Sequence, residues 1–391
     1  MRDDEGMMSA RLIGRLRTTH GAWGVETREG AHARAPHTVV AIVGEYELRE
    51  GGEDGGRGAT RAGGASVVGA RFRSVDDDDE EEEEEVVGER CDDGVVFERL
   101  GGIACASAVF EVKWSPRGGE ADDRAVVADA AGGVSLIRVA DDAREEDGAP
   151  TARVEHIVRV AELGGDGLGM VTCVDWATAA AKRGEDAFAA SASDGSFRLL
   201  RARDGGVDVV QTFERAHDLE MWAVAFDRMR DDVVYTGADD CALKTWDARD
   251  ATRASATNRK THGAGVTCVA PSPHDEHIIA TGSYDDHVRV WDCRRIATPL
   301  SECRVGGGAW RARWHRSRRA LACAAMGGGA VLVDAANGVL TRAYTYGEHE
   351  SIVYGADWVR APASEASDED VLITCSFYDN DVRCWRTQRQ Q

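Results

Sequence analysis

The segments GADDCALKTWD (residues 237–247) and GSYDDHVRVWD (residues 282–292) decide the fold, because both end in Trp-Asp after an aspartate-containing turn. Trp246 and Trp291 are separated by one repeat of about 45 residues, and a period of about 40–45 residues that closes on Trp-Asp is typical of a four-stranded propeller blade. A single blade cannot bury its own apolar faces. The repeat therefore predicts a ring of such blades.

Weaker copies of the same strand and turn pattern occur on both sides of these segments. Apolar residues alternate between Gly- and Asp-containing turns, as in half-buried strands. We predict an all-β protein, a seven-bladed WD40-type β-propeller over residues 18–387. The segments that mark its blades in order are 21–27 and 38–48, 108–116 and 132–139, 171–177 and 193–202, 221–227 and 243–247, 265–273 and 288–292, 308–316 and 328–338, and 352–358 and 376–386.

Two segments fall outside the regular pattern. Residues 1–17 form an N-terminal segment, and RLIGRLRT (residues 11–18) is the candidate for the strand that closes the last blade. Residues 49–90 are rich in Gly, Arg and acidic residues. They are predicted to form a disordered insert between blades one and two, because the unbroken acidic run at 76–85 repels itself and stays solvated.

Composition excludes several classes of function. The net charge of −22 disfavours non-specific nucleic-acid binding and suits a cationic partner. The ten cysteines include no CxxC pair and no Cys/His cluster, which favours free thiols over disulfides or a metal site. We see no signal peptide and no apolar run long enough for a membrane, so we expect a cytoplasmic protein with no membrane partner.

The usual catalytic and cofactor motifs are also missing from the sequence. GxSxG, HExxH, Walker A and GxGxxG do not occur, so we expect no cofactor. Recurring histidines and turn aspartates have a structural explanation, since in WD repeats such residues form hydrogen bonds within the blade. These are His217, His262 and His349, and Asp194, Asp240, Asp285 and Asp379.

One column of the repeat is unusually aromatic. Four residues before the end of the first strand, or its counterpart, the seven blades carry Trp23, Phe110, Thr172, Trp222, Thr267, Trp310 and Tyr354. In a propeller this position opens the innermost strand near the mouth of the central channel. Aromatic rings there can bind a quaternary ammonium group by cation–π interaction, with Glu220 and Asp286 as nearby acids. The alternative is that these side chains only pack the blades together.

Several sequence segments are more specific than the general WD-repeat pattern. In order they are VDWA (174–177), AHDLEMWAVAF (216–226), VVYTGADDCALKTWDAR (233–249), ATGSYDDHVRVWDCR (280–294), GGGAWRARWH (306–315), SIVYGADW (351–358) and TCSFYDNDVRCW (374–385). Together they resemble the WD-repeat diphthine methyl ester hydrolase family of diphthamide biosynthesis. The resemblance covers nearly all of the chain from about residue 18, apart from the acidic insert.

The resemblance implies an enzyme, a carboxylic ester hydrolase. Its substrate would be methylated diphthine, a modified histidine on translation elongation factor 2, and its products diphthine and methanol. The substrate carries a trimethylammonium group beside its ester, which agrees with an aromatic mouth, and the five aromatic members of the column are the predicted substrate-binding residues. We expect a monomer whose partner is elongation factor 2. The alternative is a non-catalytic scaffold that binds a cationic or methylated protein.

Ester hydrolysis needs a base and an oxyanion donor. His287 is the candidate base because it lies outside the repeated histidine position, and the adjacent Asp286 could orient it. Arg311 is the candidate for binding the oxyanion. Ser351 and Tyr354 are reserve candidates for nucleophile and oxyanion donor. The alternatives are a surface histidine on a turn for His287 and a salt bridge between blades for Arg311.

Overall fold

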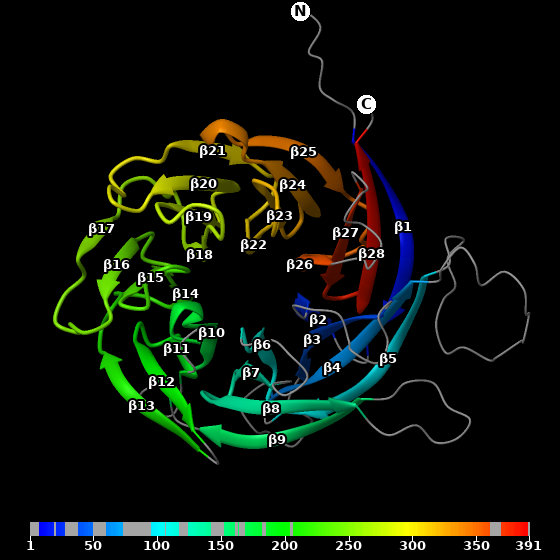
Figure 1. The fold of residues 1–391 in the computed structure, drawn as a ribbon, viewed down its shortest axis with the longest axis horizontal. Coiled ribbons are helices and arrows are strands. Elements are labelled where there is room, and N and C mark those ends of the chain that lie inside the picture. Colours follow the sequence, from blue (N-terminus) through cyan, green and yellow to red (C-terminus); the bar gives the residue numbers. More distant parts are fainter. Residues whose placement is uncertain are drawn as a thin grey trace, which may run out of the picture.

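Seven antiparallel sheets of four strands each stand around a common axis in the part of the chain that the structure describes (Figure 1). The predicted seven-bladed β-propeller is confirmed. The structure is a computed structural model that describes residues 8–18, 21–27, 38–49, 60–72, 95–105, 107–116, 124–141, 152–160, 163, 169–181, 185–203, 206–359 and 369–389. Within these ranges, helix is limited to α1 (Thr178–Ala181) and the 3-10 turn η1 (Ala336–Gly338), and neither could cross a membrane.

Each blade is built from strands that are consecutive in the sequence, except the last. Blade one contains β2 (Gly21–Thr27), β3 (Thr38–Arg49), β4 (Thr60–Phe72) and β5 (Val95–Ala104). Blade two contains β6 (Val109–Trp114), β7 (Arg124–Asp129), β8 (Val134–Asp141) and β9 (Ala152–Val160). Blade three contains β10 (Val171–Trp176), β11 (Ala187–Ala192), β12 (Phe197–Arg203) and β13 (Gly206–Phe213).

The remaining blades follow the same order. Blade four contains β14 (Met221–Phe226), β15 (Val233–Ala238), β16 (Leu243–Asp247) and β17 (Ala256–Asn258). Blade five contains β18 (Val266–Pro271), β19 (Ile278–Ser283), β20 (His287–Asp292) and β21 (Ser301–Arg304). Blade six contains β22 (Arg311–Trp314), β23 (Ala320–Ala324), β24 (Ala330–Asp334) and β25 (Thr341–Tyr346). Blade seven contains β26 (Val353–Val359), β27 (Glu369–Ser376), β28 (Asp381–Arg389) and β1 (Met8–Arg17).

The first strand of each sheet lies innermost, and these strands contact their neighbours all around the ring (Figure 1). The second strand runs back antiparallel, so that Met221 at the start of β14 pairs with Ala238 at the end of β15. The turn between the second and third strands therefore lies beside the start of the innermost strand. We call the side where the innermost strands begin the mouth face, and the opposite side the strand-end face.

The ring closes by pairing the two ends of the chain. Strand β1 is the outer strand of blade seven and pairs antiparallel with β28, the last strand of the chain. Arg15 Nε lies 2.7 Å from Asp381 Oδ1 across this pair. Residues 11–17 of the candidate closing segment lie in β1, and Thr18 directly follows it, its backbone N–H bonded to Asn380 O at 2.8 Å.

Blade one differs from the sequence interpretation. Residues 49–90 were expected to lie outside the sheets, but residues 60–72 within that range form β4, the third strand of the blade. Buried Ala65, Val67 and Val68 supply its apolar contacts. The weak signal has a physical cause, since three glycines in thirteen residues lack side chains that would show an alternating pattern. The acidic run at 76–85 is outside the described residues.

Neighbouring blades are joined on the strand-end face by repeated tryptophan hydrogen bonds. The indole Nε1–H of Trp176 donates to Lys113 O at 3.0 Å, in the preceding blade. Trp358 Nε1–H likewise donates to Arg313 O at 3.0 Å. Trp114 and Trp314 make the corresponding bonds to Glu26 O (3.2 Å) and Ala270 O (2.8 Å). A residue at the end of one innermost strand therefore fixes the position of the next blade.

The glycine of the TGADD and TGSYDD strings is required by this close packing. A Cβ on Gly237 would meet Val266 Cγ1 of the next blade at 2.5 Å. Gly282 occupies the same position in blade five, and a Cβ there would meet Ala309 O. Only glycine lets the second strand approach the next blade this closely.

The repeated histidines form hydrogen bonds inside the blades, as predicted. In blade four, His217 Nε2 lies 2.7 Å from Thr236 Oγ1, which also accepts a hydrogen bond from Trp246 Nε1 at 2.8 Å. His262 and His349 bind the equivalent threonines of blades five and seven, at 3.0 and 2.7 Å. The Trp-Asp tryptophans and the repeat histidines are therefore parts of the scaffold.

Candidate functional site: the central channel

The five aromatic residues predicted at the mouth meet in one cluster. Three of them are the second residue of an innermost strand, Trp23 is the third residue of β2, and Trp310 directly precedes β22. Successive ring centroids lie 4.1–6.5 Å apart around a closed circuit. The two threonines of the same column are fully buried, and their hydroxyls bond to backbone carbonyls of the next blade. We call the five the aromatic cluster: Trp23, Phe110, Trp222, Trp310 and Tyr354.

Members of the aromatic cluster differ in burial. Trp23 contacts the most rings, stacking on Tyr354 with centroids 4.1 Å apart and meeting Trp310 edge-on at 5.5 Å. Trp310 is 2% exposed and Phe110 is 5% exposed, which fits a packing role. Trp23, Trp222 and Tyr354 are only half-buried.

Three further aromatic residues extend the cluster, and the sequence interpretation missed them. Tyr46 stacks on Trp23 at 5.1 Å, Phe377 meets Trp23 at 5.5 Å, and Tyr284 lies 5.9 Å from Trp310. Tyr284 and Phe377 share one position, the first residue after the second strand. That position was visible in the strings SYDDH and SFYD, which would have been the signal for a second aromatic column.

Blade four has an aspartate at this same position, and it brings a carboxylate to the aromatic cluster. Asp239 Oδ1 accepts a hydrogen bond from Trp222 Nε1 at 2.8 Å. Burial raises the pKa of Asp239, although the bond from Trp222 works against that rise. Of the two acids expected near the mouth, Glu220 is exposed and its carbonyl bonds to Asp239 N, whereas Asp286 pairs with Arg304 at 3.3 Å.

The three candidate catalytic residues lie in different surroundings. His287 begins β20, and its Nδ1 lies 2.6 Å from Asp285 O. Asp286 precedes it in a left-handed turn conformation, with φ of 66°. Arg311 lies inside the channel on β22. Among the described residues, no ion pair or hydrogen bond joins Arg311 to His287 or Asp286, so the structure does not bring the three together. The base assigned to His287 stays a prediction.

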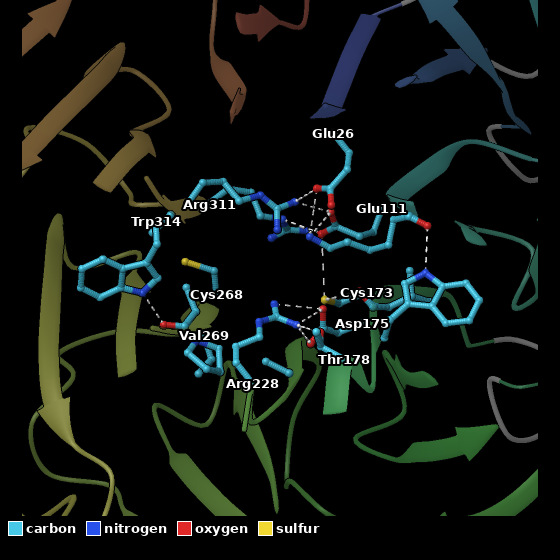
Figure 2. A pocket seen from close by; sticks show the side chains of 18 of the residues that line it. Glu26, Glu111, Cys173, Asp175, Thr178, Arg228, Cys268, Val269, Arg311 and Trp314 are labelled. Carbon is cyan, nitrogen blue, oxygen red and sulfur yellow. Dashed lines mark hydrogen bonds and ion pairs between the residues drawn. The ribbon is translucent and has the colours of Figure 1, made fainter. Parts of the chain in front are cut away.

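A group of charged side chains that includes Glu26, Glu111 and Arg311 lies inside the channel (Figure 2). The Arg311 guanidinium lies 4.8 Å from the centroid of the Trp310 ring, and its Nε is 2.7 Å from Glu111 Oε2. Arg313 Nη2 is 2.6 Å from Glu26 Oε2. We call this set the charged layer: Glu26, Glu111, Lys113, Arg311 and Arg313.

The charged layer borders a cavity of about 420 Å³ on the strand-end side. Asp175 and Arg228 form a second ion pair in its wall at 3.2 Å. Trp314 and the thiols Cys173 and Cys268 also line it, as Figure 2 shows. A volume of this size lies within the range of about 300–1,000 Å³ typical of small-molecule sites.

Burial and charge shift the titrating groups of the cavity in different directions. Burial raises the pKa of Glu26 despite the opposing charges of Arg313 and Lys113. For Glu111, burial acts the same way, but Arg311, Lys113 and Arg313 together hold the pKa below its usual value. Burial raises the pKa of the Cys173 thiol to about 11, so this sulfur is not a thiolate nucleophile at neutral pH.

The reserve candidates lie at the mouth edge of blade seven. Ser351 Oγ accepts a hydrogen bond from Tyr378 N at 2.9 Å. His349, Asp379 and Asp381 bring potential metal-ligand atoms within 4.8 Å of one another. However, His349 uses Nδ1 for Ser376 and Nε2 for Thr374, both at 2.7 Å, so neither nitrogen is available to a metal in this arrangement.

Comparisons with known proteins agree with both the fold and the motifs. A family model described as "WD domain, G-beta repeat" matches residues 255–292. The protein named diphthine methyltransferase in Mus musculus is 32% identical over 263 residues, covering 65% of this chain and 53% of the relative. The one in Homo sapiens is 32% identical over 265 residues, covering 64% and 56%. The motif resemblance is confirmed.

These relatives extend beyond the matched region, since the chain spans about half of the length of the two mammalian proteins, 53% and 56%. A similarly named protein of Dictyostelium discoideum, "Diphthine methyltransferase homolog", is 30% identical and covers 54% of this chain and 61% of its own length. Among solved structures, a chain of "Crystal Structure of Mitotic Checkpoint Complex" superposes with a TM-score of 0.58 at 15% identity, covering 96% of this chain and 94% of that chain. That likeness concerns the fold alone.

Proposed function

We propose that this protein acts in diphthamide biosynthesis and hydrolyses the methyl ester of methylated diphthine on translation elongation factor 2. The similarity to proteins named diphthine methyltransferase supports the pathway. The observation that carries the substrate assignment is the aromatic cluster with the Asp239 carboxylate bonded to Trp222. The name of these relatives, diphthine methyltransferase, describes the transfer of a methyl group from a donor. Hydrolysis is a different reaction, in which water displaces methanol from the ester.

The chemistry of the substrate matches the mouth face. Methylated diphthine carries a trimethylammonium group, which has no N–H and is bound through aromatic faces and nearby negative charge. Each such cation–π contact contributes about 0.5–2 kcal/mol. The half-buried rings of Trp23, Trp222 and Tyr354 provide the faces, and Asp239 provides the charge.

Hydrolysis adds water to the ester carbonyl, breaks the bond to the methoxy oxygen and gives a carboxylate, methanol and one proton. A base must take the proton from the attacking water. In His287, a proton on Nδ1 is held by Asp285 O at 2.6 Å, which leaves the Nε2 lone pair for this role. The tautomer follows from the hydrogen bond, because a backbone carbonyl can only accept.

The test is mass spectrometry of purified methylated elongation factor 2 after incubation with the full chain. We expect the modified histidine to lose one CH₂ unit in mass, with release of methanol and without an added methyl donor. An increase in mass that depends on a methyl donor would refute hydrolysis in favour of methylation. Tight binding with no change in mass would favour the non-catalytic scaffold.

A matched pair of variants tests the base. His287→Ala is expected to reduce turnover by about 10²–10⁴-fold, the usual contribution of a general base. His277→Ala is the control, because the side chains of His287 and His277 are similarly exposed, 30% and 34%. Full activity of His287→Ala would remove this residue from the mechanism while leaving the substrate assignment in place.

A further inference from the structure

The cavity beside the charged layer is lined by closely packed groups of both charges. Its lining residues include five cationic side chains against four carboxyl groups. Two of those carboxylates are partly occupied by backbone N–H groups: Asp357 accepts from Thr27 N at 2.7 Å, and Asp175 accepts from Phe226 N at 2.9 Å. The carboxylates therefore cannot satisfy all of the N–H groups around them.

Arg313 has N–H groups that the carboxylates of the cavity do not bind. Its Nη2 serves both Glu26 and Glu111, at 2.6 and 3.3 Å. Its Nε and Nη1 make no hydrogen bond with the described residues, and they are not among the buried polar atoms sealed from solvent. Nε–H and Nη1–H point from different edges of the guanidinium, so they cannot share one carboxylate, but either can donate a hydrogen bond to a ligand oxygen. With 19% of its side chain exposed, Arg313 can present them to the cavity.

Arg311 provides a second, independent observation. Its side chain is 9% exposed, and its Nη2 is buried without a hydrogen-bond partner. Leaving a charged donor unsatisfied is costly, and a nearby negative charge would reduce that cost.

The outer wall of the cavity could contact the apolar part of a ligand. Trp114, Trp176 and Trp314 line it, and their indole N–H groups are already bonded to backbone carbonyls. The ring surfaces that remain are apolar. A ligand with a carboxylate at one end and a flat apolar group at the other would satisfy both walls.

We propose that the strand-end cavity binds a small organic monocarboxylate, with a carboxylate oxygen accepting a hydrogen bond from Arg313 and its apolar part against the tryptophans. This site is separate from the aromatic cluster, because the charged layer lies between them: Arg311 contacts the Trp310 ring and also lines the cavity. It would allow a carboxylate metabolite to bind while the mouth face is occupied by a protein substrate.

Benzoate and benzamide form a matched pair of probes, because they share size and shape and differ in charge. We expect isothermal titration calorimetry at low salt to detect benzoate binding to the full chain, with benzamide at least about tenfold weaker, as expected for loss of a charged hydrogen bond. Inorganic phosphate should bind more weakly than benzoate. A capped peptide with one central glutamate tests the other source of a carboxylate, a side chain of a partner protein.

Variants locate the site. Arg313→Gln is expected to weaken benzoate binding by about tenfold or more. Arg228→Gln, at the wall of the cavity, gives a second measurement if Arg313→Gln does not fold, with an expected loss of several-fold. Arg249→Gln is the control, because Arg249 is 73% exposed and pairs with Asp247 outside the cavity.

Several results would overturn the proposal. These are equal binding of benzamide, stronger binding of phosphate, binding of the peptide alone, or benzoate binding that neither cavity variant changes. All of these measurements use the protein without elongation factor 2. A negative result here therefore leaves the ester-hydrolysis assay, and the function it tests, unaffected.

Discussion

The buried repeat histidines make the stability of the propeller sensitive to acid. Burial lowers the pKa of both His262 and His349 to about 4, whereas a histidine in the unfolded chain titrates near 6.5. Between these values the unfolded state binds more protons than the folded state. The free energy of unfolding must therefore fall as the pH is lowered from about 6.5 to about 4.

The magnitude follows from the two pKa values. At pH 5 nearly all of the unfolded histidine is protonated and nearly all of the folded histidine is neutral, which costs about 2 kcal/mol for each residue. Two residues together cost about 4 kcal/mol, a large share of the roughly 5–15 kcal/mol by which domains are stable. His217 is also shifted downward by burial, but its bond to Asp240 opposes the shift.

His262→Gln is the informative variant. The histidine uses Nε2 for Thr281 at 3.0 Å, and its Nδ1 has no partner, so a glutamine amide can keep the one bond that exists. Urea unfolding followed by tryptophan fluorescence at about pH 7.5 and pH 5 measures the effect. We expect the loss of stability between the two pH values to shrink by about 2 kcal/mol in this variant. His156→Gln is the control, because His156 is exposed.

Two outcomes would refute the reasoning: an unchanged stability of the natural protein between the two pH values, or the same acid sensitivity in His262→Gln and the natural protein. Either would mean that these histidines are not held neutral by the scaffold. It would also reopen the question of whether His349, beside Ser351, takes part in chemistry.

Two further predictions follow from burial. Trp310→Ala should lower the free energy of unfolding by about 3–5 kcal/mol, because this residue is 2% exposed and packs against the other rings of the aromatic cluster. Trp222 is half-buried, so Trp222→Ala should mainly weaken substrate binding, by about two- to thirtyfold. Equal urea midpoints for the two variants would contradict this difference. The rate at which iodoacetamide alkylates Cys173 should be low at neutral pH and should rise about tenfold per pH unit up to the pKa of about 11. In a peptide-mapping experiment, half-buried Cys293 should react first. A Cys173 rate that does not depend on pH would contradict this prediction.

Periodic features were predictable from the sequence because they repeat. The Trp-Asp spacing predicted the ring, and the aromatic column predicted which side chains meet, since equivalent residues of a ring converge on its axis. Strand β4 escaped detection because glycine-rich Thr60–Phe72 has too few side chains to show alternation. The roles of Asp239 and Tyr284 at the aromatic cluster were not predicted, because both residues lie in turns, where the strand pattern gives no information.

The charged layer shows a different limit of sequence reasoning. Charged residues inside predicted buried strands, such as Glu111 and Arg313, are a readable anomaly. Their pairing is not, because the two residues are 202 positions apart and meet across the channel rather than along a strand. Only the closed ring determines which opposite charges face each other, so the cavity could not be assembled from the sequence alone.

The pairing of β1 with β28 has a consequence for the synthesis of the chain. Strand β1 is synthesised long before its partner β28, because Arg15 and Asp381 are 366 positions apart in the sequence. Until then, β1 and the unfinished blade seven carry open strand edges, which are templates for aggregation. A chain truncated before β28 (Asp381–Arg389) still contains blades one to six, but it cannot pair β1 with β28, so its ring cannot close. Such products are expected to depend on chaperones and to be cleared by proteolysis.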